Sequence, residues 1–303
     1  MPPSFDALGV PAPLVRALTD RGITDPFPIQ ALTLPDALAG RDVCGRAPTG
    51  SGKTLAFGIP LAVRVTNAAP KKPKALVLVP TRELAAQVRD ELTQLLAPFG
   101  RTVHAFYGGV GFGAQRKALR SGVDVAVACP GRLEDLISQG DVRLDRVTTV
   151  VLDEADRMAD MGFLPAVRRL LDQVADDRQT LLFSATLDGD VDVLIRRYQR
   201  DPVRHGVDKD ADEPVNRHVL WRAEREEKLA LTAEIVRAHW PAIVFSRTKH
   251  GADRIARQLG RHGVDAVAIH GNRSQGQRER ALRDFTSARA QALVATDVAA
   301  RGI

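Results

Sequence analysis

Short apolar runs of strand length alternate with amphipathic stretches along the chain. After the first run, apolar residues from Leu84 to Leu96 fall at helical spacing, and Gly100 is placed to end the helix. Nearly continuous apolar strands separated by helices are typical of a parallel sheet covered on both faces. The pattern therefore predicts an α/β fold with a doubly wound parallel sheet, with strands within residues 75–79, 123–128, 147–152 and 181–183.

This alternation is interrupted once and then restarts. Residues 208–214 are almost entirely polar and end in proline, which favours a linker. The second part again has apolar runs, and the helix between the first two carries Ala252, Ala256 and Leu259 on one face. A length of 303 residues is compatible with two domains. We predict a first domain at 1–207, a linker at 208–214 and a second domain at 215–303.

The clearest chemical signal is the stretch Ala-Pro-Thr-Gly-Ser-Gly-Lys-Thr at residues 47–54. Backbone N–H groups of such a loop surround phosphates, so the predicted cradle is Thr49, Gly50, Ser51 and Gly52. Lys53 would neutralise the outer phosphates and Thr54 would offer its hydroxyl to Mg²⁺. The general pattern has glycine where this chain has alanine, at residue 47. A helix N-terminus after a glycine turn is the alternative for this loop taken alone.

A second signal, Asp153-Glu154-Ala155-Asp156, follows the apolar run 147–152. Acidic residues at the carboxyl end of a buried strand lie where an α/β sheet holds a metal and the attacking water. Asp153 would hold Mg²⁺ through water. A solvated acidic turn is the alternative, although the preceding Val-Val-Leu disfavours it. The two signals together predict a nucleoside triphosphatase.

Further segments, in the matching order along the chain, resemble motifs of the DEAD-box RNA helicases of superfamily 2. They are Gly22 to Gln30 with Phe5 upstream, Pro80-Thr81-Arg82-Glu83-Leu84, Gly108-Gly109, Pro130-Gly131-Arg132, Ser184-Ala185-Thr186, Val244-Phe245-Ser246-Arg247-Thr248, Gln275 with Arg278, and residues 295–302. Each match is weak alone, whereas this many in order are specific. The resemblance runs from Phe5 to the last residue and implies two RecA-like domains.

The resemblance also implies an activity, ligands and residue roles. It implies an ATP-dependent RNA helicase that couples hydrolysis of Mg²⁺-bound ATP to local unwinding or to remodelling of RNA–protein complexes. Glu154 would orient and deprotonate the attacking water, and Ser184 and Thr186 would couple hydrolysis to unwinding. The other nucleotide-binding residues would be Phe5, Ile23, Gln30 and Asp297. The RNA-binding residues would be Pro80, Thr81, Arg82, Gly109, Pro130, Arg132, Arg247, Gln275, Arg278 and Thr296.

Three features depart from the family pattern. Ile23 stands where an aromatic residue is more frequent, and Cys129 stands where threonine usually precedes Pro-Gly-Arg. The printed chain stops at Ile303, inside the fifth motif, so we expect an incomplete second domain, no arginine finger and weak hydrolysis. The alternative function is therefore a module that binds ATP and RNA without effective hydrolysis. A DNA helicase is disfavoured, because Gln30 and the Asp-Glu-Ala-Asp motif point to the RNA-acting family.

Charge and composition refine this interpretation. Residues 215–303 contain 16 Lys and Arg against 9 Asp and Glu, a net charge of +7, whereas the whole chain carries +6. The second domain should therefore supply most of the long-range attraction for RNA. Aromatic residues make up only 5%, so largely sequence-independent contacts to phosphate and sugar are expected rather than base stacking.

The remaining residues point to no additional chemistry. Cys44 and Cys129 lie in strand-like contexts and are expected to be buried thiols. His104 and His270 lie at strand ends and are assigned no role. No apolar run has the length of a membrane span, and no signal sequence is evident, which fits a cytoplasmic protein.

Overall fold

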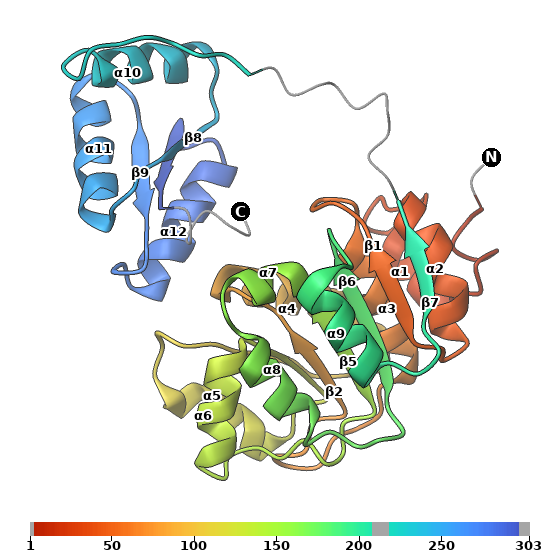
Figure 1. The fold of residues 1–303 in the computed structure, drawn as a ribbon. Helices are drawn as coiled ribbons and strands as arrows, with labels where there is room; N and C mark the ends of the chain where they lie inside the picture. The colour runs from red at the N-terminus through yellow and green to blue at the C-terminus, as the bar shows by residue number, and fades with distance from the viewer. Residues whose placement is uncertain (1–2, 208–217, 297–303) are drawn as a thin grey trace. The chain divides into compact units, whose positions relative to one another are not determined.

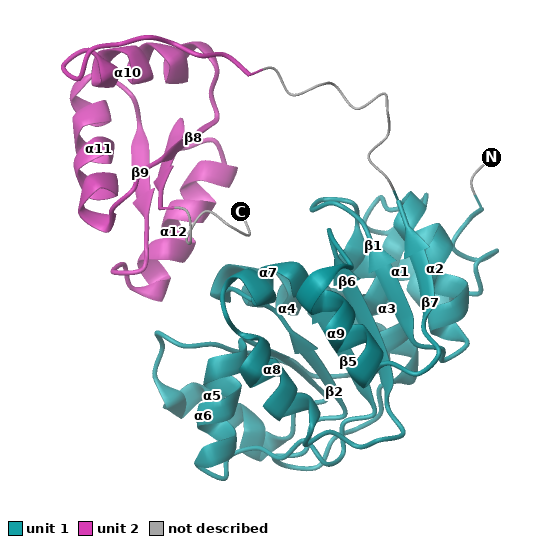
Figure 2. Ribbon diagram, in the orientation of Figure 1, with its two compact units in different colours: residues 1–213 teal, residues 214–303 magenta. Residues whose placement is uncertain are grey.

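The computed structural model describes residues 3–207 and 218–296. The chain divides into two compact units, residues 1–213 and residues 214–303 (Figure 2). The predicted domains, 1–207 and 215–303, lie within these units. The predicted linker 208–214 lies outside the described residues, as does Asp297.

Unit 1 is built on a seven-stranded sheet in which every pairing is parallel (Figure 1). The strand order is β3-β4-β2-β5-β6-β1-β7. Parallel strands all end at the same edge of a sheet, so the segments that follow them converge there. The strands are β1 (Val43–Arg46), β2 (Ala75–Leu78), β3 (Val103–Phe106), β4 (Val125–Ala128), β5 (Thr149–Asp153), β6 (Gln179–Ser184) and β7 (Val203–Gly206).

Helices cover both faces of this sheet, as predicted. On one face lie α1 (Ala12–Thr19), α2 (Pro28–Leu38), α3 (Lys53–Arg64), α4 (Arg82–Leu96) and the short 3₁₀ helix Ala97–Phe99. On the other face lie α5 (Phe112–Ser121), α6 (Pro130–Ser138), α7 (Ala155–Asp160), α8 (Leu164–Leu171) and α9 (Gly189–Tyr198). Strand side chains alternate between the two cores: Val77 packs with the first set and Leu76 with the second.

The sequence pattern missed two edge strands. β7 lies in a stretch expected to lead into the linker, yet it pairs with β1 from Val203 beside Val43 to Gly206 beside Arg46. Its residues alternate between half-buried and exposed, so it lacks the continuous apolar run of a central strand. β3 is half-buried at Val103 and His104 for the same reason.

Unit 2 has a smaller parallel sheet of three strands in the order β8-β10-β9. The strands are β8 (Ala242–Phe245), β9 (Ala266–Ile269) and β10 (Ala292–Ala295), and the helices are α10 (Lys228–Ala238), α11 (Lys249–Arg261) and α12 (Gln275–Thr286). α10 and α11 pack on one face of this sheet, against Ala268 and Val294. α12 packs on the other face, against Ile269 and Leu293.

Candidate nucleotide-binding site

The glycine-rich loop joins the end of β1 to the start of α3. Gly52 immediately precedes α3 in the left-handed conformation, with φ of +82°, which favours glycine. Lys53 is the first residue of the helix and is buried, with its Nζ donating to the carbonyl oxygens of Ala47 at 3.0 Å and Pro48 at 3.3 Å. Ser51 Oγ donates to the same Pro48 oxygen at 2.7 Å. The loop thus encloses a lysine charge at a helix N-terminus, an arrangement suited to phosphate.

Asp153 is the last residue of β5, at the edge of the sheet where the loop begins. Its side chain is only 3% exposed, and its Oδ1 accepts the backbone N–H of Glu154 at 3.0 Å. Burial raises the pKa of Asp153 to about 7, while the positive charge of Lys53 opposes that rise. A bound cation would favour the charged form of this carboxyl group, because burial has removed the water that would otherwise solvate it. Together with the Thr54 hydroxyl, the carboxyl group offers the hard oxygen ligands that fit Mg²⁺.

Glu154 has a backbone conformation that is unusual for a residue with a side chain. Its φ of 52° and ψ of 53° lie in the left-handed region, at a cost of about 1–2 kcal/mol. The side chain is buried, and its Oε2 lies 3.7 Å from Nη1 of Arg157. The chain therefore turns sharply at Glu154, between the end of β5 at Asp153 and the start of α7 at Ala155.

Asp156 is joined to the end of β6 by two hydrogen bonds. Its backbone N–H donates to Ser184 Oγ at 3.1 Å, and its Oδ2 accepts from the N–H of Ala185 at 3.2 Å. Ser184 is fully buried, whereas Thr186 is exposed beyond the strand. These hydrogen bonds of Asp156 connect Ser184 and the N–H of Ala185, but not Thr186, to the acidic motif.

Gln30 connects the start of α2 to the glycine-rich loop. Its Oε1 accepts the backbone N–H of Phe27 at 2.9 Å, and its Nε2 donates to the carbonyl oxygen of Gly52 at 2.9 Å. A side-chain amide has two donor hydrogens and two acceptor lone pairs, so one of each stays unused. The remaining N–H and the remaining lone pair are the donor and the acceptor that hydrogen bonding to one edge of a base requires.

The two apolar residues predicted to contact the base, Phe5 and Ile23, pack into or against the core of unit 1. Phe5 is 2% exposed in the core of unit 1, and Ile23 is half-buried against that core. Phe27, which sequence reasoning missed, is 52% exposed. A Cβ added to Gly52 would fall within contact distance of the Phe27 ring and of the Gln30 amide. Phe27 is therefore an exposed aromatic residue beside this loop, and the signal available in the sequence was its position three residues before Gln30.

The predicted RNA-binding residues of unit 1 follow β2, β3 and β4. Thr81 is buried and its Oγ1 accepts the N–H of Leu84 at 3.3 Å, which starts α4. Gly109 has φ of +80°, and a Cβ there would overlap the guanidinium of Arg82, so the two residues are in close contact. Pro80 and Pro130 are both buried.

Arg132 is engaged within the protein. Its Nη1 and Nη2 each donate to the carbonyl oxygen of Val110 at 3.1 Å, and its guanidinium stacks 4.1 Å from the centre of the Phe112 ring. The side chain is mostly buried, and burial lowers its pKa. This geometry makes Arg132 a support of the loop at 108–112 rather than an open phosphate ligand.

The predicted RNA-binding residues of unit 2 differ in exposure. Arg247 is exposed just before Thr248, the residue whose hydroxyl caps α11. Gln275 and Arg278 lie in the first turn of α12 and are buried, and Gln275 Nε2 donates to Glu279 at 3.3 Å. Thr296 is half-buried after β10. Only Arg247 among the arginine and glutamine side chains of this set is widely accessible.

The cysteines take no part in this site. Cys44 is buried with its Sγ donating to Gln199 at 2.7 Å, Cys129 is half-buried, and neither forms a disulfide. Burial raises the pKa of both thiols to about 12. His104 packs against Phe106. None of the helices in the described parts of the chain is long and apolar enough to cross a membrane.

Comparison with protein families identifies the class to which this fold and loop belong. Residues 27–194 match the DEAD/DEAH box helicase family, and residues 227–303 match the helicase conserved C-terminal domain. The first match alone covers more than half of the chain. The chain therefore belongs to the DEAD/DEAH box helicase family.

Individual relatives agree with this assignment. DEAD-box ATP-dependent RNA helicase 30 of Arabidopsis thaliana is 41% identical over 309 residues, covering 99% of this chain and 52% of the relative. ATP-dependent RNA helicase DBP2 of Meyerozyma guilliermondii is 41% identical, covering 99% of this chain and 56% of the relative. The chain thus spans about half the length of these relatives.

Solved structures show the same two RecA-like units. A DEAD box protein from Methanococcus jannaschii has a TM-score of 0.65 and 33% identity, covering 99% of this chain and 82% of the other. A yeast DEAD-box splicing factor has a TM-score of 0.64 and 33% identity, covering 97% and 71%. The predicted α/β fold with RecA-like parallel sheets is confirmed.

Proposed function

We propose that this chain binds ATP and RNA as part of an ATP-dependent RNA helicase, which couples hydrolysis to local unwinding or to remodelling of RNA–protein complexes. The observation that carries the proposal is the convergence of Lys53, Asp153 and Glu154 at one edge of the sheet, with Gln30 bonded to the glycine-rich loop. Family membership supports the same activity class.

The phosphates bind along Thr49, Gly50, Ser51 and Gly52 at the N-terminus of α3. Lys53 exchanges its two carbonyl partners for phosphate oxygens. Thr54, and Asp153 through water, would hold Mg²⁺, which would supply charge neutralisation. Glu154, fixed by its left-handed backbone, orients the attacking water and takes a proton from it.

The base is recognised at its edge and on its face by different residues. The free N–H and lone pair of the Gln30 amide match the ring nitrogen and the exocyclic amine of adenine, which present one acceptor and one donor. Phe27 offers an exposed aromatic face beside this amide. Phe5 and Ile23 support the same segment from within the core.

RNA binds through its phosphates and sugars. In unit 1, Arg82 supplies charge together with the polar groups of Thr81 and Gly109, and Arg132 holds the loop at 108–112. In unit 2, Arg247 supplies charge and Thr296 supplies a hydroxyl group. Gln275 and Arg278 contribute from the start of α12. The net charge of +7 on residues 215–303 attracts the polyanion at long range. Affinity should therefore fall steeply with salt and depend little on base sequence.

The test measures binding and hydrolysis by the same chain. Calorimetric titration with Mg²⁺-ATP and fluorescence anisotropy with a labelled poly-uridine strand should both give saturable binding. ATP hydrolysis should rise when RNA is added and should drop by about two orders of magnitude in Lys53→Ala. Arg64→Ala, at the far end of α3, is the matched control. Saturable binding of both ligands without RNA-stimulated hydrolysis would instead favour a binding module, and failure to bind ATP would refute the proposal.

A further inference from the structure

In the described part of unit 2, strand β9 forms one edge of the sheet. It pairs with β10 from Ala266 beside Ala292 to Ile269 beside Ala295, and β10 separates it from β8. Exposed strand edges are usually protected by charges, prolines or bulges. The sequence Ala-Val-Ala-Ile of β9 contains none of these, and Ala266 and Val267 are half-exposed. Ala268 and Ile269 are buried, so the strand is open to solvent mainly at its first half.

A pocket of about 910 Å³ runs along this edge. It is lined by Ala266, Val267 and Ala268 of β9 together with residues of both α11 and α12. α11 and α12 cover opposite faces of the sheet. A pocket lined by both helices therefore extends from one face of the sheet, past the outer edge of β9, to the other face. The result is a groove with a strand as its floor and one helix as each wall.

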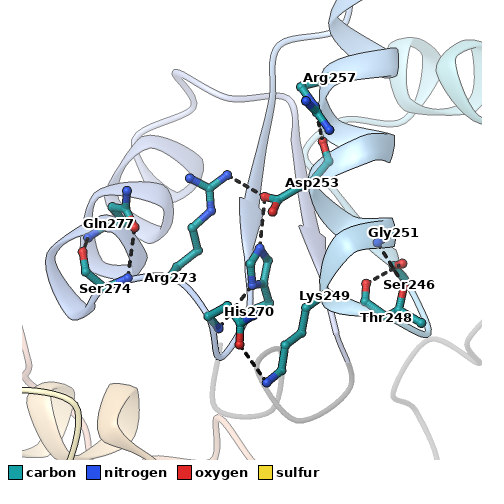
Figure 3. Close-up of polar contacts among 11 residues, drawn as sticks. Ser246, Thr248, Lys249, Gly251, Asp253, Arg257, His270, Arg273, Ser274 and Gln277 are labelled. Atoms are coloured by element: carbon teal, nitrogen blue, oxygen red, sulfur yellow. Dashed lines mark hydrogen bonds and ion pairs between the residues drawn. The ribbon is translucent and has the colours of Figure 1, made fainter.

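A hydrogen-bond network fixes one end of this groove (Figure 3). Asp253 Oδ1 on α11 lies 3.0 Å from Nε2 of His270 and 2.6 Å from Nη2 of Arg273. His270 Nδ1 accepts the backbone N–H of Asn272 at 3.3 Å, and Nε2 faces Asp253. The hydrogen bond from His270, helped by Arg273, lowers the pKa of Asp253. Lys249 Nζ donates to Asn272 at 3.0 Å, which ties the start of α11 to the same loop.

The network leaves the groove with excess positive charge. Both acidic residues of its lining are already paired, Asp253 with Arg273 and Asp284 with Arg289. Arg257 on α11 and Arg280 on α12 form no ion pair with any residue in the described ranges. Each wall of the groove thus carries one arginine whose charge is uncompensated.

We propose that this groove binds an extended acidic peptide, which adds a strand to the open edge of β9. Successive side chains of a strand point to opposite faces of the sheet. Two adjacent acidic residues in the added strand would therefore meet Arg257 on one wall and Arg280 on the other. Ala266 and Ala268 are small, which lets the peptide backbone approach the strand.

The groove is separate from the predicted RNA-binding residues. Arg247, Gln275, Arg278 and Thr296 do not line it. A strand edge also offers regularly spaced N–H and C=O groups, which a peptide backbone complements and a nucleic acid does not. RNA and peptide should therefore bind to the chain at the same time.

The experiment uses the whole chain and a fluorescein-labelled, strand-forming heptapeptide of Val and Thr with a central Glu-Glu pair. Two comparison peptides carry Lys-Lys at the centre or methyl groups on the central backbone nitrogens. The double variant Arg257→Glu with Arg280→Glu tests whether the arginine on each wall of the groove contributes to binding of the acidic peptide. The control is Arg254→Glu with Arg283→Glu, which makes the same charge change on the same two helices outside the groove.

The expected result is saturable binding of the acidic peptide, weakened by about tenfold or more in the wall variant and unchanged in the control. The Lys-Lys and N-methylated peptides should bind weakly, and hydrogen exchange at 266–269 should slow when the acidic peptide binds. Poly-uridine RNA should leave peptide binding intact. Equal binding of the N-methylated peptide, displacement by RNA, or no binding at millimolar peptide would each overturn the proposal.

Discussion

Asp153 shows how one buried carboxyl group can serve both the fold and the chemistry. It ends a central strand, next to a residue in the left-handed conformation, and burial raises its pKa to about 7. A charged carboxylate in that position is unfavourable unless a cation accompanies it. Burial of the Asp153 carboxylate therefore lowers the stability of the cation-free protein. The same burial favours cation binding, because the cation offsets the buried negative charge.

Asp153→Asn should stabilise the metal-free protein at high pH. The folded pKa, about 7, lies above the reference value of 3.8, so stability contributed by the protonated carboxyl is lost as pH rises through 7. The gain from Asp153→Asn, measured by urea unfolding with circular dichroism, should be larger at pH 8 than at pH 5 by about 2 kcal/mol. Mg²⁺ with ADP should stabilise the parent more than the variant. A pH-independent difference would contradict the elevated pKa.

Gln30 should determine which base is preferred. Gln30→Ala removes the amide that we propose recognises the base edge, so affinities for ATP and GTP should become equal within about threefold. Phe27→Ala should weaken both nucleotides without changing their ratio, because a ring face does not distinguish purines. Calorimetry with ATP, GTP and pyrophosphate provides the measurement, and unchanged pyrophosphate affinity confirms that the glycine-rich loop is intact. Equal affinities in the parent chain would refute the role of Gln30.

At the scale of elements, the central strands of unit 1 were predictable and its edge strands were not. β2 and β4 are buried on both faces, so their sequences are continuous apolar runs. β3 and β7 have one open side and mixed residues, and only pairing with β4 and β1 defines them. The sequence predicted that the motifs follow the carboxyl ends of strands, but it did not predict which side chains contact one another.

Arg132 illustrates that difference. Its motif predicted an RNA ligand, but pairing with Val110, which is distant in sequence, depends on how β3 and β4 lie side by side. No periodicity in the sequence contains that information. The contact gives Arg132 a positioning role in the loop at 108–112.

Arg132→Lys should loosen this loop and weaken RNA binding. Lysine cannot form the paired hydrogen bonds to Val110 or stack its charge flat on Phe112. Stability of unit 1 should fall by about 1–2 kcal/mol, hydrogen exchange at 108–112 should accelerate, and RNA affinity should drop about tenfold. Nucleotide affinity should not change. Arg120→Lys, an exposed change at the end of α5, is the control, and slow exchange at 108–112 in Arg132→Lys would contradict the assignment.

At the scale of the whole molecule, the two units differ in the size of their cores. Unit 1 has two large clusters of buried apolar residues, one on each face of seven strands. The clusters of unit 2 are smaller, and Ala, a small side chain, accounts for many of their members. Since stability grows with the apolar surface that folding buries, unit 2 should be the less stable unit.

Urea unfolding should therefore show two transitions, with unit 2 unfolding first. Both tryptophans of the chain, Trp221 and Trp240, lie in unit 2, so tryptophan fluorescence reports on that unit alone. The fluorescence midpoint should fall below the main transition seen by circular dichroism, which is dominated by the larger unit 1. Mg²⁺ with ADP should raise the second midpoint and leave the fluorescence midpoint unchanged, because the predicted nucleotide-binding residues lie in unit 1, among them Gln30, Lys53 and Asp153, apart from Asp297 in unit 2. Coincident transitions that shift together with nucleotide would instead show that the two units unfold as one cooperative body.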